Sequence, residues 1–312
     1  MTRIVTLVIL ATLAIALFAV FILPWLLPRP GLDGTIPEQP FSDSAFIEID
    51  STRLHYRSRL TGHSEKKLVV LIHGFGGSSF SWRHSLDALE SEGYRAIAID
   101  LPPFGYSERR ADGPDWASLV LRLADEIDPE AELVLIGHSM GARVAAQAAA
   151  HAGERASQLV MVAGTPAVNG RTRGGPAWMT RIPSLTRWAE ILAAHRLIDE
   201  DEFKTLLGSA LGRTPTPEEL SGYREPLTVP GTYPALLRRL ALESEHQTGN
   251  WHSVPTSLVW GEQDRWVPLA QAHALLEDHP ELQLHTMPET GHNPMDTHAD
   301  EFNEILIGIL RH

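Results

Sequence analysis

The chain has 312 residues, enough for one large α/β domain with a full core, and its 43% apolar and 21% charged residues are ordinary globular usage. The formal net charge is −13 and only three residues are lysine, which argues against a nucleic-acid-binding surface. Cysteine is absent from the sequence, which excludes disulfides, thiol nucleophiles and cysteine-based zinc sites.

The first 27 residues differ from the rest. Residues 4–27 are uncharged and almost wholly apolar, which is long enough to span a membrane. The stretch ends in Pro24, Trp25 and Pro28, so residues 1–27 are interpreted as an uncleaved single-pass anchor. A cleaved signal peptide, giving a secreted protein, is the alternative. Arg3 and the N-terminal amino group precede the span and Arg29 follows it, which slightly favours a main domain outside the cytoplasm.

Residues 28–44 are rich in proline, glycine and acidic residues, and they are predicted to form a linker. The segments FIEID and LHYRSRL then alternate in polarity, which predicts an antiparallel hairpin. Apolar runs predict six further strands, at residues 68–72, 96–99, 133–136, 159–162, 256–260 and 281–286. Helices are expected to begin near residues 82, 115, 140, 269 and 298.

This alternation predicts an α/β fold with a mostly parallel central sheet and helices on both faces. The core is expected to comprise residues 45–165 and 254–312. Residues 166–253 contain helical patches and no strand-like run, which predicts a helical lid over the carboxyl ends of the strands. Several lid side chains are candidates either for an acyl pocket or for the packing of the lid itself: Trp178, Trp188, Ile191, Leu192, Tyr223, Tyr233 and Leu236.

Ser139 lies in the sequence GHSMG, between an apolar run and an alanine-rich helical stretch. This matches the G-x-S-x-G nucleophile elbow, in which a serine stands on a sharp strand-to-helix turn. The N–H of Met140, at the start of the helix, is one expected oxyanion donor. The second is the N–H of Phe75 in HGFGG, the loop after strand 68–72, where His73 is expected to hold the loop by hydrogen bonds.

A serine nucleophile needs a base, and the base needs a carboxylate that orients it. Asp264 follows the strand at 256–260, and His292 follows the last strand. Because functional residues lie at strand ends in this architecture, Asp264 is the predicted acid and His292 the predicted base. The rivals are Glu262 for the acid, and His285 and His298 for the base.

No metal-ligand spacing and no nucleotide-binding loop in a strand–helix context occurs in the sequence, so neither a metal nor a cofactor is expected.

Together these stretches resemble the α/β-hydrolase superfamily over about residues 45–312. DLPPFGYS (Asp100–Ser107) is similar to a D-x-x-G-x-G-x-S loop of that superfamily, and GHNPM to its G-H-x-P ending. Pro103 stands where a glycine is usual, and MDTHADEF lacks the customary glutamate and proline. Asp100 is expected to pin its loop through hydrogen bonds. A serine at the elbow differs from the aspartate of the haloalkane dehalogenases and epoxide hydrolases.

The resemblance implies a serine hydrolase that cleaves carboxylic esters through an acyl-enzyme on Ser139. An anchor with a helical lid is similar in layout to membrane-anchored monoacylglycerol lipases and carboxylesterases, which implies a lipophilic, small-molecule ester. The closest alternative is a carbon–carbon bond hydrolase of ring-cleavage products that uses the same triad. A non-catalytic binding protein of this fold is a further alternative.

Overall fold

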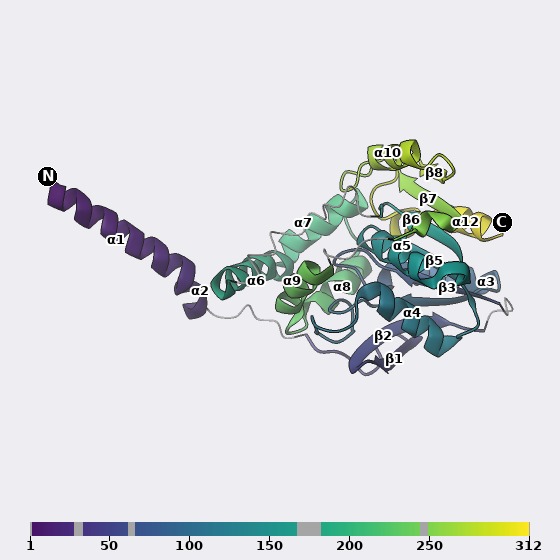
Figure 1. Cartoon of the computed structure of the whole chain (residues 1–312), viewed down its shortest axis with the longest axis horizontal. Helices are drawn as coiled ribbons and strands as arrows, with labels where there is room; N and C mark the ends of the chain where they lie inside the picture. Colours follow the sequence, from purple (N-terminus) through teal and green to yellow (C-terminus); the bar gives the residue numbers. More distant parts are fainter. Residues whose placement is uncertain (1, 28–33, 62–65, 167–181, 244–248, 312) are drawn as a thin grey trace.

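The computed structural model describes residues 2–27, 34–61, 66–166, 182–243 and 249–311. A twisted sheet forms the centre of the main domain, and the first helix projects away from it (Figure 1). The sheet has eight strands in the order β1-β2-β4-β3-β5-β6-β7-β8. Their bounds are β1 Ser44–Ile49, β2 Thr52–Arg59, β3 Lys67–Ile72, β4 Arg95–Ile99, β5 Glu132–His138, β6 Ala156–Val162, β7 Thr256–Gly261 and β8 Gln283–Met287.

The pairing confirms the predicted hairpin and the mostly parallel sheet. β1 pairs with β2 and β2 with β4 in antiparallel fashion, whereas β4, β3, β5, β6, β7 and β8 pair in parallel. The last strand begins at Gln283, two residues later than predicted, because Leu282 N–H is held in a turn by His279 O at 3.2 Å. The carboxyl ends of the parallel strands therefore meet at one edge of the sheet.

Helices cover both faces of the sheet, as the continuous apolar strands predict. One core contains Leu68 and Val70 of β3 with α4 and α5, and the other contains Val69 and Leu71 with α3 and α12. Because adjacent strand residues point to opposite faces, β3 fills both cores. Apart from the N-terminal segment, the helices outside the β6–β7 connection are α3 Arg83–Ser91, α4 Trp116–Ile127, α5 Met140–Ala152, α10 Ala270–Asp278, α11 Pro294–Thr297 and α12 Ala299–Leu310, with 3-10 turns η1 Ser79–Trp82 and η2 Gly153–Arg155.

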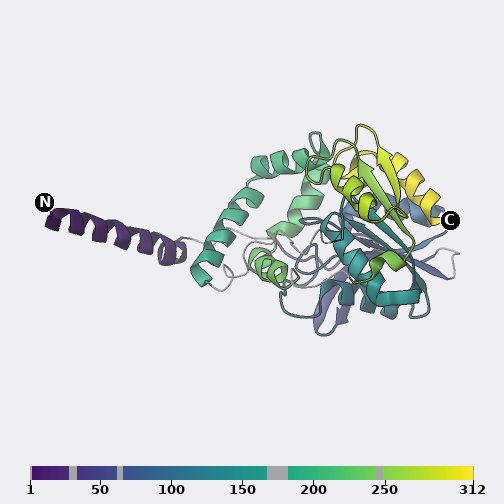
Figure 2. The same cartoon turned by 45° about the horizontal axis from the view of Figure 1, so that its top comes forward.

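The described residues of the connection between β6 and β7 form helices and loops but no strand. The connection contains α6 Pro183–Ile198, α7 Glu200–Leu211, α8 Pro217–Arg224, η5 Glu225–Thr228, α9 Thr232–Glu243 and η6 Trp251–Ser253. Local signals fix two of the helix starts: Asp199 accepts a hydrogen bond from Glu202 N–H, and Thr216 forms a capping box with Glu219. In Figure 2 these helices lie between the N-terminal helix and the sheet.

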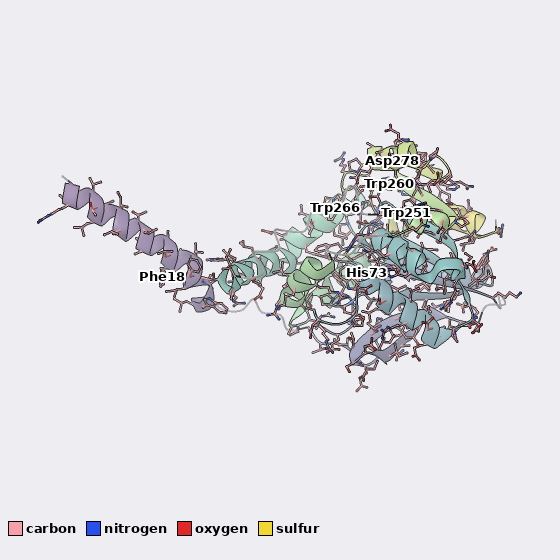
Figure 3. The ribbon with its side chains drawn as sticks, viewed as in Figure 1. Phe18, His73, Trp251, Trp260, Trp266 and Asp278 are labelled. Atoms are coloured by element: carbon pink, nitrogen blue, oxygen red, sulfur yellow. The ribbon has the colours of Figure 1, made fainter. Side chains whose placement is uncertain are left out.

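The N-terminal segment forms helix α1, Thr2–Phe21, and a short helix α2, Leu23–Leu26. Residues 3–21 have a mean hydropathy of 2.9, and none of the most apolar window is buried. The side chains of α1, Phe18 among them, stand out from the helix on all sides (Figure 3). The end of this segment contacts α6: Trp188 Nε1 donates to Ala19 O at 3.1 Å, and Arg187 Nε to Pro24 O at 3.4 Å.

Candidate active site

Ser139 occupies the turn between β5 and α5. Its backbone has φ 52° and ψ −115°, a region that non-glycine residues rarely adopt, and its N–H donates to Val162 O at 2.8 Å. The flanking glycines allow the close packing behind it. A Cβ on Gly137 would lie 2.1 Å from Gly141 O, and a Cβ on Gly141 would lie 2.5 Å from the carbonyl oxygens of Ile72 and His73. The turn can therefore form only with glycine on both sides of the serine.

The loops after β7 and β8 bring Asp264 and His292 together. Asp264 Oδ2 accepts from His292 Nδ1 at 2.8 Å, and its Oδ1 accepts from the N–H groups of Trp266 at 2.8 Å and Val267 at 2.9 Å. Both side chains are buried. With Nδ1 bound to the carboxylate, His292 carries its proton there and keeps Nε2 as an acceptor. This is the arrangement that a general base requires.

Ser139 and His292 line the same cavity, which has a volume of about 260 Å³. Among the described residues no hydrogen bond joins the two side chains, and such contacts are commonly longer before a substrate binds. The cavity lies beneath α7, and its wall also includes glycine-loop and lid residues: Gly74, Phe75, Gly76, Gly77, Ser81, Phe104, His138, Phe203, Leu206, Leu207, Ala210, Tyr223, Leu227, Leu236, Trp266 and Asn293.

The loop after β3 is held as expected by His73. Its Nε2 accepts from Leu101 N–H at 3.0 Å, so its Nδ1 carries the proton and donates to Gly74 O at 2.7 Å. Burial lowers the pKa of His73, which keeps the ring neutral. In the part of the chain that the structure describes, the N–H groups of Phe75 and Met140 make no hydrogen bond. They are the two amides that were predicted to bind an oxyanion.

Asp100 pins its loop by three hydrogen bonds, which confirms the interpretation from sequence. Oδ1 accepts from Ser79 N–H at 2.6 Å, and Oδ2 accepts from Tyr106 N–H and His55 Nδ1, each at 2.7 Å. Burial raises the pKa of this carboxyl group, but its charge and hydrogen-bond interactions with His55 and the hydrogen bond from Ser79 N–H outweigh burial and lower the pKa to about 2. Asp100 does not line the cavity.

His138 is a site residue that the sequence analysis did not single out. Its ring lies 4.8 Å from that of His292, and its Nε2 lies 2.9 Å from His292 O. Because a carbonyl only accepts, Nε2 must carry the proton and donate. Burial, followed by the nearby His292, lowers the pKa of His138 well below its ordinary value. A neutral His138 thus fixes the backbone of the residue that bears the base.

The rival residues and the lid candidates take other positions. Glu262 is exposed and does not line the cavity, and His285 lies within β8. Among the lid candidates, Tyr223 and Leu236 line the cavity. Tyr233 is buried and Ile191 is partly buried, but neither lines the cavity. Leu192 is 62% exposed, and Trp188 donates a hydrogen bond to Ala19 O. Trp178 lies outside the described residues.

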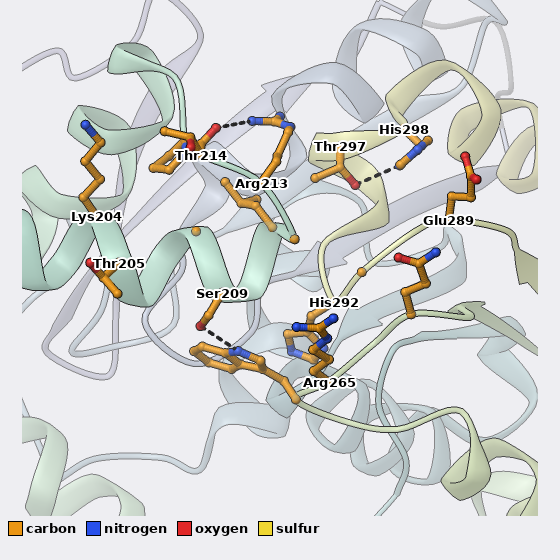
Figure 4. A pocket seen from close by; sticks show the side chains of 17 residues that line it. Lys204, Thr205, Ser209, Arg213, Thr214, Arg265, Glu289, His292, Thr297 and His298 are labelled. Carbon is orange, nitrogen blue, oxygen red and sulfur yellow. Dashed lines mark hydrogen bonds between the residues drawn. The ribbon is translucent and has the colours of Figure 1, made fainter.

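A second, more open cavity of about 840 Å³ has Ser209, Arg213 and His292 among its lining residues (Figure 4). Trp266 and His292 line both cavities. The indole stacks on the His292 ring at 5.6 Å with 22° between the planes, and its Nε1 donates to Ser209 Oγ of α7 at 3.1 Å. The outer cavity, unlike the inner one, has charged side chains on its walls, among them Lys204, Arg213, Arg265 and Glu289. Trp266 thus contributes to the wall of a largely apolar inner cavity and to that of an outer cavity of mixed polarity.

Comparison with known proteins agrees with this architecture. The uncharacterized hydrolase YugF of Bacillus subtilis (strain 168) is 29% identical over 262 residues, covering 79% of this chain and 90% of that protein. A 2-hydroxy-6-oxononadienedioate/2-hydroxy-6-oxononatrienedioate hydrolase of Pseudomonas putida is 29% identical over 301 residues, covering 89% and 100%. The crystal structure of a membrane phospholipase A described as a bacterial virulence factor is similar in fold, with a TM-score of 0.64 and 20% sequence identity. The match covers 100% of this chain and 98% of that one.

The model of one protein family, described as the alpha/beta hydrolase family, matches residues 69–305. That range contains Ser139, Asp264 and His292, and it agrees with the parallel sheet and with the resemblance seen in the sequence motifs. The chain is therefore a hydrolase that belongs to the alpha/beta hydrolase family.

Proposed function

We propose that the protein is a serine hydrolase that cleaves carboxylic esters through an acyl-enzyme on Ser139. The observation that carries this proposal is that His292, oriented by Asp264 at 2.8 Å, opens onto the same cavity as a serine held on a strained strand-to-helix turn. Nucleophile, base and orienting carboxylate are all present, which is the constellation that acyl transfer requires.

In the proposed reaction Ser139 Oγ attacks the ester carbonyl carbon, and His292 Nε2 takes the hydroxyl proton. The N–H groups of Phe75 and Met140 bind the oxyanion that forms. The tetrahedral intermediate collapses as His292 returns the proton to the alcohol oxygen, and the alcohol leaves. Water then attacks the acyl-enzyme with His292 again as base, which releases the acid and restores Ser139. Asp264 stabilises the imidazolium in both halves.

The lining of the inner cavity supports a neutral, lipophilic ester. Among the described residues that line it, none is Lys, Arg, Asp or Glu, and leucine and phenylalanine side chains predominate. A charged group would lose its hydration there without gaining a partner. The related hydrolase from Pseudomonas putida is named for a dioate, which carries two carboxylates. The apolar lining thus favours the ester over the carbon–carbon bond reaction for this chain.

The N-terminal helix supports a membrane location for this activity. Helix α1 is long and apolar enough to cross a bilayer. A membrane phospholipase A shares the fold over the full length of the chain. We propose that α1 anchors the enzyme and that residues 166–253 act as a lid over the cavity, beside the source of a lipophilic substrate.

The proposal is tested by labelling and turnover of the purified full-length chain. A fluorophosphonate probe is expected to label the wild type and not Ser139→Ala, which should also lose ester turnover by about 10⁶-fold. Asp264→Asn is expected to retain the fold and lose about 10⁴-fold in kcat, as this change does in a serine-protease triad. A series of p-nitrophenyl esters defines the acyl length.

Two outcomes would contradict the ester hypothesis. Turnover of a vinylogous diketone in preference to every ester would favour the carbon–carbon bond hydrolase. A well-folded wild-type chain that neither reacts with the probe nor hydrolyses any ester would favour a non-catalytic binding protein.

A further inference from the structure

Apart from Ser139, His138 and His292, the inner cavity has one polar corner in an apolar wall. It is formed by Ser81, Tyr223 and Asn293, all of which line the cavity and are at least 95% buried. They come from three separate elements: η1, lid helix α8, and the position directly after the base His292. The reaction described above uses none of the three. Buried polar groups in an apolar cavity normally have hydrogen-bond partners, so each must be accounted for.

The hydroxyl proton of Tyr223 has a fixed direction. Tyr223 Oη donates to Asp296 Oδ2, while the other oxygen of Asp296 accepts from Arg83. Burial raises the pKa of Asp296 above its ordinary value, but the positive charge of Arg83 opposes that shift and pairs with the ionised form. Burial and the charge of Asp296 raise the pKa of Tyr223 well above its ordinary value, so the phenol keeps its proton. The carboxylate can only accept, and the phenol therefore donates to it.

This direction determines how the Asn293 side chain is oriented. With its own proton directed at Asp296, Tyr223 Oη can offer its neighbours only lone pairs. The Asn293 amide nitrogen lies 3.4 Å from it and is the group that can donate. The Ser81 side chain lines the same corner. The opposite atom, Asn293 Oδ1, has no hydrogen-bond partner among the described residues, although Asn293 is 95% buried.

We infer that Asn293 Oδ1 is a substrate-binding acceptor that receives a hydrogen bond from a hydroxyl group on the alcohol part of the ester. The inference rests on the proposed ester hydrolysis. Because His292 must reach the leaving oxygen, the residue next to it lies on the alcohol side of the scissile bond. The ligand class is a neutral ester of a polyol, such as a glycerol monoester, since no cationic side chain among the described residues lines this cavity.

A polyol ester satisfies the acceptor, whereas a simple alkyl ester leaves it unpaired in an apolar cavity. We expect strong discrimination between the two kinds of ester. When the alkyl ester binds, the buried Asn293 oxygen loses its hydrogen bond to water and gains no hydrogen bond in return. Tyr223, Asp296 and Arg83 act as positioning residues in this scheme, since they hold the amide in the orientation that exposes its oxygen. Lid helix α8 thereby contributes to substrate choice through the phenol of Tyr223.

The test compares two esters of one acid, 1-hexanoylglycerol and propyl hexanoate, which differ only in two hydroxyl groups. The wild-type full-length chain is expected to prefer the glycerol ester in kcat/KM. Asn293→Leu, which keeps the approximate shape without the acceptor, should lower kcat/KM for the glycerol ester by about tenfold or more and change the propyl ester less than threefold. Release of hexanoic acid, followed in a pH-stat, measures the hydrolysis of both esters by both chains.

Tyr223→Phe provides a second variant that tests positioning. It removes the hydroxyl that orients the amide, so the preference for the glycerol ester should fall part of the way toward that of Asn293→Leu. Tyr233→Phe is the matched control. Tyr233 is a buried lid tyrosine whose hydroxyl has no partner among the described residues, and it does not line the cavity. This control should leave the ratio of the two kcat/KM values at the wild-type level.

The outcomes separate this inference from the proposed function. If the wild type hydrolyses both esters and neither variant changes their ratio, the inference is overturned and the ester hydrolase stands. Equal losses on both esters in Asn293→Leu would assign Asn293 to the base and also overturn it. If the wild type hydrolyses neither ester and resists the fluorophosphonate probe, the proposed function fails as well. Probe labelling of each variant verifies that its active site is folded.

Discussion

Asp100 and Asp264 are both buried aspartates paired with a histidine, but they serve different parts of the molecule. Asp264 orients His292 at the cavity, whereas Asp100 ties His55 and two backbone N–H groups together away from it. The role of a carboxylate–histidine pair therefore depends on the surroundings of the second ring nitrogen, the one that does not bond to the carboxylate. The other ring nitrogen of His55 lies 2.7 Å from Ser44 Oγ, so that ring has no open side.

Asp100 predicts a specific pH dependence of stability. Its ordinary pKa of 3.8 is lowered to about 2 in the folded chain, so the stabilisation is complete above about pH 4 and is lost as the pH falls toward 2. The ionised Asp100 carboxylate thereby contributes about 2 kcal/mol to the free energy of unfolding. We expect the difference in unfolding free energy between wild type and Asp100→Asn to shrink by about that amount between pH 5 and pH 2. Urea unfolding at several pH values measures it, and a difference independent of pH would contradict it.

The residues of the site differ in how far the sequence could predict them. Ser139, Asp264 and His292 stand at strand ends in recognisable local patterns, so their positions could be predicted one at a time. His138 and Asn293 could not. His138 bonds to a carbonyl 154 residues away, and Asn293 to a phenol 70 residues away. Neither pairing has a local pattern, because a side chain and its distant partner share no spacing in the sequence.

At the scale of elements, helix α5 packs unusually close to the sheet. Gly141 in its first turn lies against the carbonyl oxygens of Ile72 and His73 at the end of β3, and Gly137, near the end of β5, lies against Gly141 and Ala142 of α5. This contact places the start of α5 beside the loop that carries Phe75. The two predicted oxyanion donors thus derive their relative position from a pair of glycines.

Substitution of Gly141 is predicted to be disruptive for that reason. A Cβ at 2.5 Å from two backbone oxygens forces α5 away from β3, so Gly141→Ala should lower the unfolding free energy by about 3 kcal/mol or more. The control is Gly308→Ala in helix α12, where a Cβ meets nothing within 4 Å. That change should raise stability by up to about 1 kcal/mol. Thermal unfolding of both variants measures these changes in stability. A Gly141→Ala variant as stable as the wild type would refute the packing argument.

The predicted strands and helices of the core were confirmed because each has a strong local signal. Continuous apolar runs such as residues 68–72 are buried on both faces, and Asp115 accepts a hydrogen bond from Ser118 N–H at the start of α4. The lid has weaker signals. Its helices show no continuous apolar run, and the contact of α6 with α1 and α2 depends on two side chains that bond to distant carbonyl groups. Periodicity does not encode contacts of that type.

At the scale of the whole molecule, the N-terminal helix is separable from the chemistry. Every described residue that lines the inner cavity lies between 74 and 293. A chain without residues 1–27 should therefore leave the membrane fraction and keep its turnover of a short, soluble ester. It should also unfold at a lower temperature, since Trp188 and Arg187 lose the acceptors they use at Ala19 and Pro24, at about 1 kcal/mol each.

Fractionation and calorimetry of both chains test this. Washed membranes should retain the full-length chain, with its N-terminal segment still attached. Recovery of that chain in the soluble fraction with the segment removed would instead support a cleaved signal peptide.

If α1 spans a bilayer as proposed, its contact with α6 would couple the lid to bilayer thickness. Residues 3–21 form a span of about 28 Å, close to the thickness of the hydrocarbon layer. A thinner bilayer tilts such a helix, and the hydrogen bonds from Trp188 and Arg187 tie α6 to the end that moves. Under the proposed topology, lipid composition would therefore change the position of α6, which packs against α7, the helix that lines the inner cavity.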